Sequence, residues 1–318
     1  MALLDNPAVP KGSIALVTGV NGLLGSHIAK QFLEYGYKVR GTVRDLEKNF
    51  WLSTAFDRQY GPDKFELVQV RDMMSEGAFN EAVKGVAIVV HTASVMSLDP
   101  DPHNVIPRVI DGAVNALKAS YSEPSVKRFI FTSSSAAVVS PWDNHEPLVI
   151  TEASWNEDLV KQAWANPPYT AERIASVYGA SKVQSEQAIW KYHKENHSQR
   201  PDLVVNTKYY IDVDDTGRLH VAAAIFGHVR DQRIFGFAGR FNWDEVLDIL
   251  REDKPSRMLP ENFSSGVDPH EIEPRDKAEQ LLRDLGRPGW TSLKNSVLRT
   301  IESFRTAGDE AKVYEWDT

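Results

Sequence analysis

Short apolar runs alternate with amphipathic segments along the first two-thirds of the chain. The short runs are rich in β-branched residues, and the longer segments between them repeat their apolar positions with helical spacing. We expect strands at residues 14–18, 38–42, 65–70, 86–90, 129–132 and 202–206. We expect helices at 26–35, 105–120 and 178–192. This alternation predicts an α/β protein with a doubly wound parallel sheet, the Rossmann arrangement.

The last third of the chain is mostly helical. A strand-like run at 233–238 precedes predicted helices at 242–251, 276–285 and 292–304. We expect residues 1–207 to form a nucleotide-binding domain and 208–318 to form mainly a smaller substrate-binding lobe, with 208–230 returning to the core. Residues 141–175 lack strong periodicity, so we expect them to form an excursion over the site, where aromatic side chains such as Trp142 could contact substrate.

A glycine turn follows the first predicted strand. Gly19, Gly22 and Gly25 have the spacing G-x-x-G-x-x-G and lead into the first predicted helix. Gly19 permits a tight turn, Gly22 lets the backbone approach a pyrophosphate, and Gly25 lets the helix pack closely on the strand. Strand, glycine turn and helix in this order predict a dinucleotide site, with the phosphates at the helix N-terminus.

Basic residues end the second predicted strand. Arg40 and Arg44 lie there, and Lys48 follows one turn later. A ribose 2′-phosphate needs cationic hydrogen-bond donors, whereas a free 2′-hydroxyl is usually held by a carboxylate. The sequence therefore favours NADP over NAD. In the competing interpretation, Asp45 binds the ribose and both arginines are solvated surface residues.

Polar and small residues follow the next predicted strands. Asp72, beside Met73, could accept a hydrogen bond from the adenine amino group, or it could cap a helix beginning near Gly77. Small residues at 92–94 suit a backbone passing close to a ligand, and serines at 133–135 stand at the sheet edge where ligands bind. His91 alone indicates no catalytic role.

Tyr178 and Lys182 lie four residues apart on a predicted helix, so both side chains can point into one small volume. A cation beside a phenol favours the phenolate, which makes the phenol a better acid near neutral pH. This pair predicts a proton donor and the group that tunes it.

Composition narrows the function further. The net charge of −8 argues against nucleic acid or an anionic membrane surface as a partner. The chain has no cysteine, which excludes thiol catalysis and is compatible with the cytoplasm. We find no apolar run of membrane-spanning length and no cluster of His, Asp and Glu with metal-ligand spacing. We therefore expect no metal, no nucleic acid and no membrane partner.

Together, these motifs resemble those of the extended short-chain dehydrogenase/reductases. The dihydroflavonol reductase-like branch is most similar, in particular its fungal and yeast NADPH-dependent aldehyde or carbonyl reductases of the aldehyde reductase II type. The resemblance rests on the following segments: Leu16-Val-Thr-Gly-Val-Asn-Gly22, Val39-Arg-Gly-Thr-Val-Arg44, Phe131-Thr-Ser-Ser134, Tyr178-Gly-Ala-Ser-Lys182, Val213-Asp-Asp-Thr-Gly217 and Leu285-Gly-Arg-Pro-Gly-Trp290.

The resemblance implies a catalytic group of Ser134, Tyr178 and Lys182. In the implied reaction, NADPH delivers hydride to a carbonyl carbon, Tyr178 donates the proton, and Lys182 also holds the nicotinamide ribose. The expected cofactor-binding residues are Gly19, Asn21, Gly22, Leu23, Leu24, Arg40, Arg44, Lys48, Asp72, Met73, Thr92, Ala93, Ser94, Thr132, Tyr178 and Lys182.

The chain departs from the family pattern after the sixth predicted strand. The family continues with a Pro-containing turn and a few tens of residues beside the substrate, but here Thr207 is followed at once by another strand-like run, 208–213. We predict that a segment is missing from the numbered chain and that Thr207 and Lys208 lie much farther apart than the roughly 3.8 Å of a trans peptide. The alternative is a true deletion, which would place the activity in doubt.

The expected function is NADPH-dependent reduction of small-molecule aldehydes and activated ketones, such as oxo esters, by a monomer or homodimer. A dihydroflavonol reductase-type or sugar-nucleotide enzyme is the alternative within this class. A non-catalytic NADP-sensing protein is an alternative from another class, but such proteins typically lose the tyrosine or the lysine.

Overall fold

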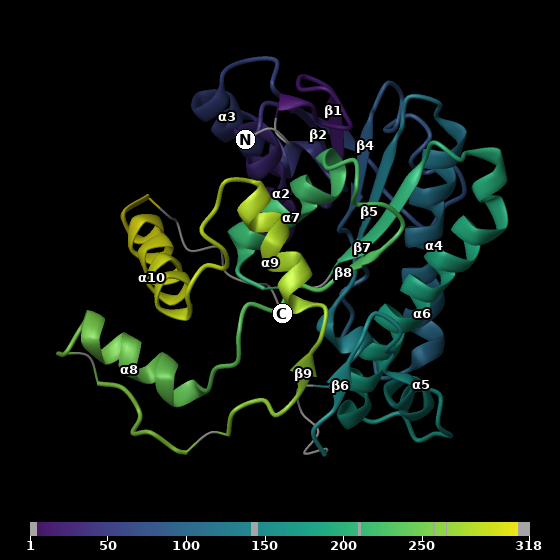
Figure 1. Ribbon diagram of the computed structural model, residues 1–318. Coiled ribbons are helices and arrows are strands. Elements are labelled where there is room, and N and C mark those ends of the chain that lie inside the picture. The colour runs from purple at the N-terminus through teal and green to yellow at the C-terminus, as the bar shows by residue number, and fades with distance from the viewer. Residues whose placement is uncertain (1–4, 141–145, 209–210, 257, 265, 311–318) are drawn as a thin grey trace.

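Seven parallel strands form the central sheet of the computed structural model, which describes residues 5–140, 146–208, 211–256, 258–264 and 266–310 (Figure 1). The strand order is β3-β2-β1-β4-β5-β7-β8. Their bounds are β1 Ile14–Thr18, β2 Lys38–Val43, β3 Phe65–Gln69, β4 Ile88–His91, β5 Arg128–Thr132, β7 Val204–Lys208 and β8 Arg233–Ile234. The order reverses between β1 and β4, which confirms the doubly wound arrangement and predicts ligand binding at the carboxyl ends of these two strands.

Helices cover both faces of the sheet. One face carries α2 (Leu23–Glu34), α3 (Leu46–Tyr60) and α7 (Val213–Ile225), with α9 (Arg275–Asp284) against α7. The other face carries α4 (Pro102–Ser122) and α6 (Ile174–Asn196), which pack on each other. Within β1, Ala15 and Val17 join the core under the first set of helices and Leu16 joins the second, as the two-residue period of a strand buried on both faces requires.

A short helix, α5 (Glu157–Ala163), packs against α6. The contact depends on Gly179, because a Cβ at that position would lie 2.2 Å from Leu159 Cδ1. Trp142 and the other residues of 141–145 lie outside the described residues. The role of 141–175 as an excursion over the site therefore stays a prediction.

The C-terminal part contains α8 (Trp243–Asp253), α10 (Leu293–Glu310) and a second small sheet that pairs β6 (Val149–Ile150) with β9 (Glu271–Ile272). Figure 1 shows α8 and α10 away from the central sheet, and α8 has no buried residue. The proposed boundary at residue 207 falls inside β7, and α7 is a buried helix of the core.

Several boundaries differ from those predicted. Helix α2 begins at Leu23 rather than Ser26, because Gly22 is its N-cap. Residues 77–85 form turns rather than a helix, and β8 ends at Ile234. The sequence analysis missed α3 and α5. Exposed apolar side chains such as Phe50 and Trp51 obscure the amphipathic pattern of α3.

The predicted break between Thr207 and Lys208 is wrong. Both residues belong to β7, where Thr207 pairs with Phe131 and Lys208 with Thr132 of β5. The predicted second strand at 208–213 is also wrong at its carboxyl end, because Asp212 caps α7 by accepting hydrogen bonds from the amides of Asp214 and Asp215. An acidic cap and an acidic first turn outweigh the strand propensity of this run.

Candidate active site

The glycine turn lies at the carboxyl end of β1. Gly19 adopts the left-handed φ of +62°, and a Cβ there would lie 3.2 Å from Ala93 at the end of β4. A Cβ on Gly25 would lie only 2.3 Å from the carbonyl oxygen of Gly19, so this glycine lets α2 approach the turn. Gly22 caps α2 without a side-chain hydrogen bond from the described residues. The helix therefore presents its N-terminal amides at the reversal point of the sheet, the environment that binds a phosphate group.

Thr18 joins this turn to the end of β4. Its hydroxyl accepts hydrogen bonds from the amides of Thr92 and Ala93, both at 3.0 Å, and lies 3.1 Å from Nδ1 of His91. Because these two amides occupy both lone pairs of the hydroxyl oxygen, Thr18 donates its own proton to His91. Burial, aided by the charge of Lys182, lowers the pKa of His91 to about 3, so its ring is neutral. Thr18 therefore holds the backbone of Thr92 and Ala93 beside the glycine turn, with His91 as the partner of its hydroxyl.

The two arginines near the end of β2 have different surroundings. Arg40 donates to Glu66 at 2.6 Å and to the carbonyl oxygens of Ala82 and Lys84, both at 2.8 Å. These contacts give Arg40 a structural role, so the structure does not support it as a phosphate ligand. Arg44 is exposed, and its guanidinium has no hydrogen bond or ion pair within the described chain.

Asp45 and Lys48 complete this strand end. Asp45 caps α3 by accepting from the amide of Lys48 at 3.1 Å. This helix cap accounts for an aspartate at position 45 without a role in binding the ribose. The Lys48 side chain is exposed at the first turn of α3. Arg44 and Lys48 are therefore the cations available to a 2′-phosphate.

At the end of β3, Asp72 holds a turn together. Its carboxylate accepts from the amide of Met74 and the hydroxyl of Ser75, and these hydrogen bonds hold its pKa below the ordinary value. Met73 is half-buried and packs toward Gly112 of α4. The hydrogen bonds of Asp72 favour a capping role for its carboxylate. The capped segment is a turn rather than the expected helix. Adenine binding by Asp72 stays a prediction.

At the end of β5, consecutive side chains face opposite sides of the sheet. Thr132 is buried, and its hydroxyl lies 2.9 Å from Nε2 of His220 in α7, so cofactor binding by Thr132 stays a prediction. Ser133 donates to Glu186 of α6 at 2.6 Å. Ser134 is half-buried and caps a short 3-10 turn by accepting from the amide of Ala136 at 3.2 Å.

Ser134, Tyr178 and Lys182 come together at this edge of the sheet. The Tyr178 hydroxyl donates to Ser134 Oγ at 3.4 Å, across 44 residues of sequence. The Lys182 ammonium lies 5.9 Å from the centre of the Tyr178 ring. Two hydroxyls and a cation therefore converge where one substrate oxygen could meet both hydroxyls, the arrangement that proton donation to a carbonyl requires.

Lys182 is 6% exposed, which is unusual for a lysine. Burial lowers its pKa to about 8, while the charge of Glu186 acts in the opposite direction. The ammonium therefore still carries its proton at neutral pH but titrates just above it. The described residues contain no group of three or more His, Asp or Glu side chains placed to hold a metal ion.

Glu186 is a residue of this site that the sequence analysis did not identify. Its side chain is fully buried and accepts from Ser133, Thr207 and Arg233. Its position one turn after Lys182 is the only sequence signal, and that spacing also occurs on ordinary solvated helices.

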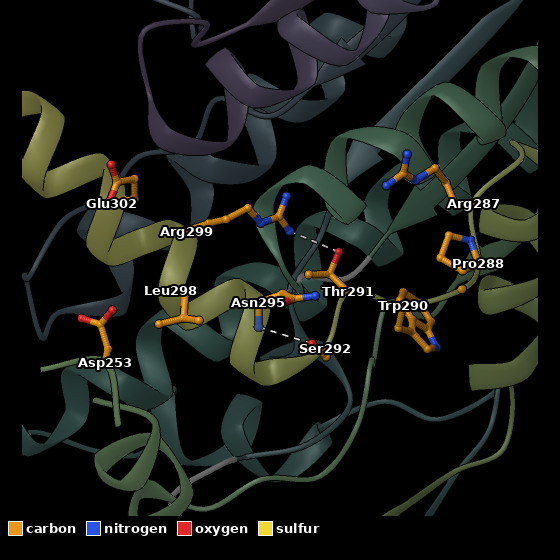
Figure 2. A pocket seen from close by; sticks show the side chains of 11 residues that line it. Asp253, Arg287, Pro288, Trp290, Thr291, Ser292, Asn295, Leu298, Arg299 and Glu302 are labelled. Atoms are coloured by element: carbon orange, nitrogen blue, oxygen red, sulfur yellow. Dashed lines mark hydrogen bonds between the residues drawn. The ribbon is translucent and has the colours of Figure 1, made fainter. Parts of the chain in front are cut away.

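A separate cavity of about 660 Å³ lies between the end of α8, residues 287–292 and α10 (Figure 2). Its lining mixes acidic Asp253 and Glu302 with basic Arg287 and Arg299. Arg299 is held by Asp212, Asp214 and Thr291. None of the three catalytic candidates lines this cavity, so its size alone does not make it the active site.

Comparison with known proteins identifies the family of this chain. The sequence model of the NAD dependent epimerase/dehydratase family matches residues 15–201. The chain belongs to this family. It is 35% identical to aldehyde reductase 2 of Sporidiobolus salmonicolor, over 95% of this chain and 99% of that protein. It is 31% identical to the ketoreductase nvfG of Aspergillus novofumigatus, over 92% of this chain and 97% of that protein.

A solved structure shows the same fold. The yeast methylglyoxal/isovaleraldehyde reductase Gre2, complexed with NADPH, superposes with a TM-score of 0.77 at 23% identity, covering 94% of this chain and all of that one. In the described part of this family member, none of the helices is both long and apolar enough to cross a membrane.

This family member is shorter than its relatives. The alignment with the aldehyde reductase spans 342 positions but takes in 95% of the 318 residues, about 302. About 40 aligned positions therefore face gaps in this chain.

Proposed function

We propose that the protein is an NADPH-dependent carbonyl reductase that converts aldehydes and activated ketones, such as 2- or 3-oxo esters, to alcohols. The observation that carries this proposal is the contact between Tyr178 and Ser134 beside the buried cation of Lys182. The names of the relatives, an aldehyde reductase and a ketoreductase, support it.

NADPH, when bound, supplies the hydride for the carbonyl carbon. Ser134 donates a hydrogen bond to the carbonyl oxygen and fixes its position. Tyr178 donates its proton to that oxygen as negative charge develops there. The Lys182 ammonium stabilises the phenolate that remains, and its burial strengthens this interaction because little water screens the charge.

The residues around the glycine turn fit a dinucleotide. The N-terminus of α2, which has no side-chain cap, would hold the pyrophosphate, and the close approach of Gly25 to Gly19 sets the position of this helix end. Arg44 and Lys48, both exposed at the end of β2, would hold the 2′-phosphate and favour NADPH. Thr92 and Ala93 would line the nicotinamide side.

The test is turnover of a panel of aldehydes and oxo esters, followed by NADPH absorbance, with NADH in parallel. We expect oxidation of NADPH that depends on the carbonyl compound and is slower with NADH. The variant Lys182→Arg is a matched control for the charge of this side chain, because arginine keeps the positive charge but cannot lose its proton near neutral pH. The absence of turnover across the panel by folded protein that binds NADPH would contradict the proposal. Conversion of a sugar nucleotide instead would favour an epimerase.

We further propose that the enzyme acts in the cytoplasm as a monomer or homodimer. Analytical ultracentrifugation tests the oligomeric state, and a fluorescent fusion in the source cell tests the location. A larger assembly or an organellar signal would contradict the respective expectation.

A further inference from the structure

A buried carboxylate lies at the junction of the catalytic helix with three strand ends. Glu186 of α6 is 0% exposed, and one of its oxygens accepts from Ser133 at 2.6 Å. The other accepts from Thr207 at 2.6 Å and from Nε of Arg233 at 2.9 Å. Since a buried charge is costly unless it is paired and hydrogen-bonded, this set of partners fixes the carboxylate tightly.

The partners of Glu186 belong to the elements that build the site. Ser133 precedes Ser134 at the end of β5, Thr207 belongs to β7, and Arg233 opens β8. Arg233 also donates to the carbonyl oxygens of Glu152 and Ser154, so the same cluster holds the segment between β6 and α5. A single carboxylate thus connects α6 to the end of β5, to β7 and to β8.

The spacing along α6 places Glu186 in line with the reacting groups. Tyr178, Lys182 and Glu186 follow one another at intervals of four residues, so they share one face of the helix. Movement of Glu186 would therefore move the Tyr178 hydroxyl relative to Ser134. That contact is 3.4 Å in this structure, near the limit of a hydrogen bond, so a small shift of the helix would break it.

We propose that Glu186 is a positioning residue that holds the Tyr178 and Lys182 face of α6 against Ser134 and keeps Lys182 in its charged form. It touches none of the reacting atoms and acts through Lys182 and Ser133. This inference rests on the proposed carbonyl reduction.

The electrostatic part of the proposal has a definite sign. Burial lowers the pKa of Lys182, and the charge of Glu186 opposes that effect. Among the described residues, the other titratable groups shown to face Lys182 are Tyr178 on the same helix and His91 on β4, which is neutral. Arg233 on β8 is paired with Glu186. Removal of the carboxylate charge therefore lowers the pKa of Lys182 further, and activity is lost at a lower pH.

The first experiment compares Glu186→Gln with Thr207→Val. Both variants disturb the same buried cluster, but only the first removes a charge. We expect the alkaline limb of the kcat/KM profile to fall by roughly one pH unit in Glu186→Gln, the size of an ordinary shift from one neighbouring charge. In Thr207→Val the limb should stay in place while the melting temperature falls. The proposal is contradicted if the alkaline limb of the kcat/KM profile stays in place in Glu186→Gln and activity falls only in proportion to the amount of folded protein. Glu186 would then have a purely structural role.

A second measurement separates this inference from the proposed function. Selective ¹³Cε labelling of lysine lets the pKa of Lys182 be read by NMR without turnover, with its signal assigned by its loss in Lys182→Arg. A lower Lys182 pKa in Glu186→Gln supports the inference even if no carbonyl compound is reduced, and an unchanged pKa overturns it.

Glu186→Asp keeps the proposal testable if Glu186→Gln does not fold. The shorter side chain retains the charge but cannot reach Ser133 and Thr207 together. We expect an unmoved alkaline limb with kcat lowered about tenfold or more, since misplacement by about 1 Å can cost a hundredfold. Unchanged kcat in a folded Glu186→Asp enzyme would show that the position of Glu186 does not matter.

Discussion

Gly25→Ala tests how closely α2 must approach the glycine turn. The added Cβ would lie 2.3 Å from the carbonyl oxygen of Gly19 and 2.9 Å from Cα of Val20, whereas ordinary contacts begin at 3.4 Å. Both neighbours are backbone atoms, so α2 must retreat by roughly 1 Å. Overpacking of this kind costs about 1–3 kcal/mol of folding free energy, and the helix N-terminus moves away from the phosphates.

The expected effect on the cofactor follows from the amides that lose contact. A hydrogen bond to a charged group contributes about 1.5–3 kcal/mol, so loss of one raises the NADPH dissociation constant roughly 10- to 100-fold. Fluorescence titration measures this constant, and a thermal melt measures the stability.

Gly227→Ala is the matched control, because no heavy atom lies within 4 Å of the place that an added Cβ would take and its φ is not positive. The control should leave both NADPH binding and the melting temperature unchanged. A folded Gly25→Ala protein that binds NADPH as tightly as the parent would refute the role of α2 in forming the cofactor site.

Further predictions concern the arginines and the acid stability. Arg44→Ala should weaken NADPH binding by about 1.5–3 kcal/mol with little effect on NADH, whereas Arg40→Ala should lower the melting temperature and leave the NADPH-to-NADH ratio unchanged. Equal losses for both cofactors in Arg44→Ala would contradict its role. A hydrogen bond from His27 and nearby cations hold the pKa of Asp214 below its ordinary 3.8, so the stability that this carboxylate contributes is lost as pH falls below that value. Urea melts across this range should show a shallower acid decline for Asp214→Asn, and an equally steep decline would contradict this.

The sheet and the proximity of Ser134, Tyr178 and Lys182 could be predicted because their signals are local. Strands buried on both faces need continuous apolar runs such as Ile14–Thr18, and the glycine turn needs a residue that tolerates the left-handed φ of Gly19. Tyr178 and Lys182 carry their relation in a four-residue spacing. Their approach to Ser134 follows once the end of β5 and the start of α6 meet at one sheet edge.

The parts that sequence reasoning missed depend on distant partners. Arg40 looks like a phosphate ligand until Glu66 and the carbonyl oxygens of Ala82 and Lys84 surround it. Glu186 looks like a solvated helix residue until β5, β7 and β8 bury it. Neither set of partners can be inferred from the spacing along one element.

The junction at Thr207 was misjudged for a different reason. The strand propensity of the residues after it suggested two strands with nothing between them. In the structure, Lys208 ends β7 and Asp212 caps α7, so the described residues of this run do not form a second strand.

The most direct test of the central claim is Tyr178→Phe, assayed for carbonyl reduction and for NADPH binding. The ring keeps its packing and only the hydroxyl that contacts Ser134 is lost. General acid catalysis contributes about 10²- to 10⁴-fold, so kcat should fall by at least that order while the NADPH dissociation constant stays nearly unchanged. Turnover near that of the parent enzyme would contradict the proposed mechanism.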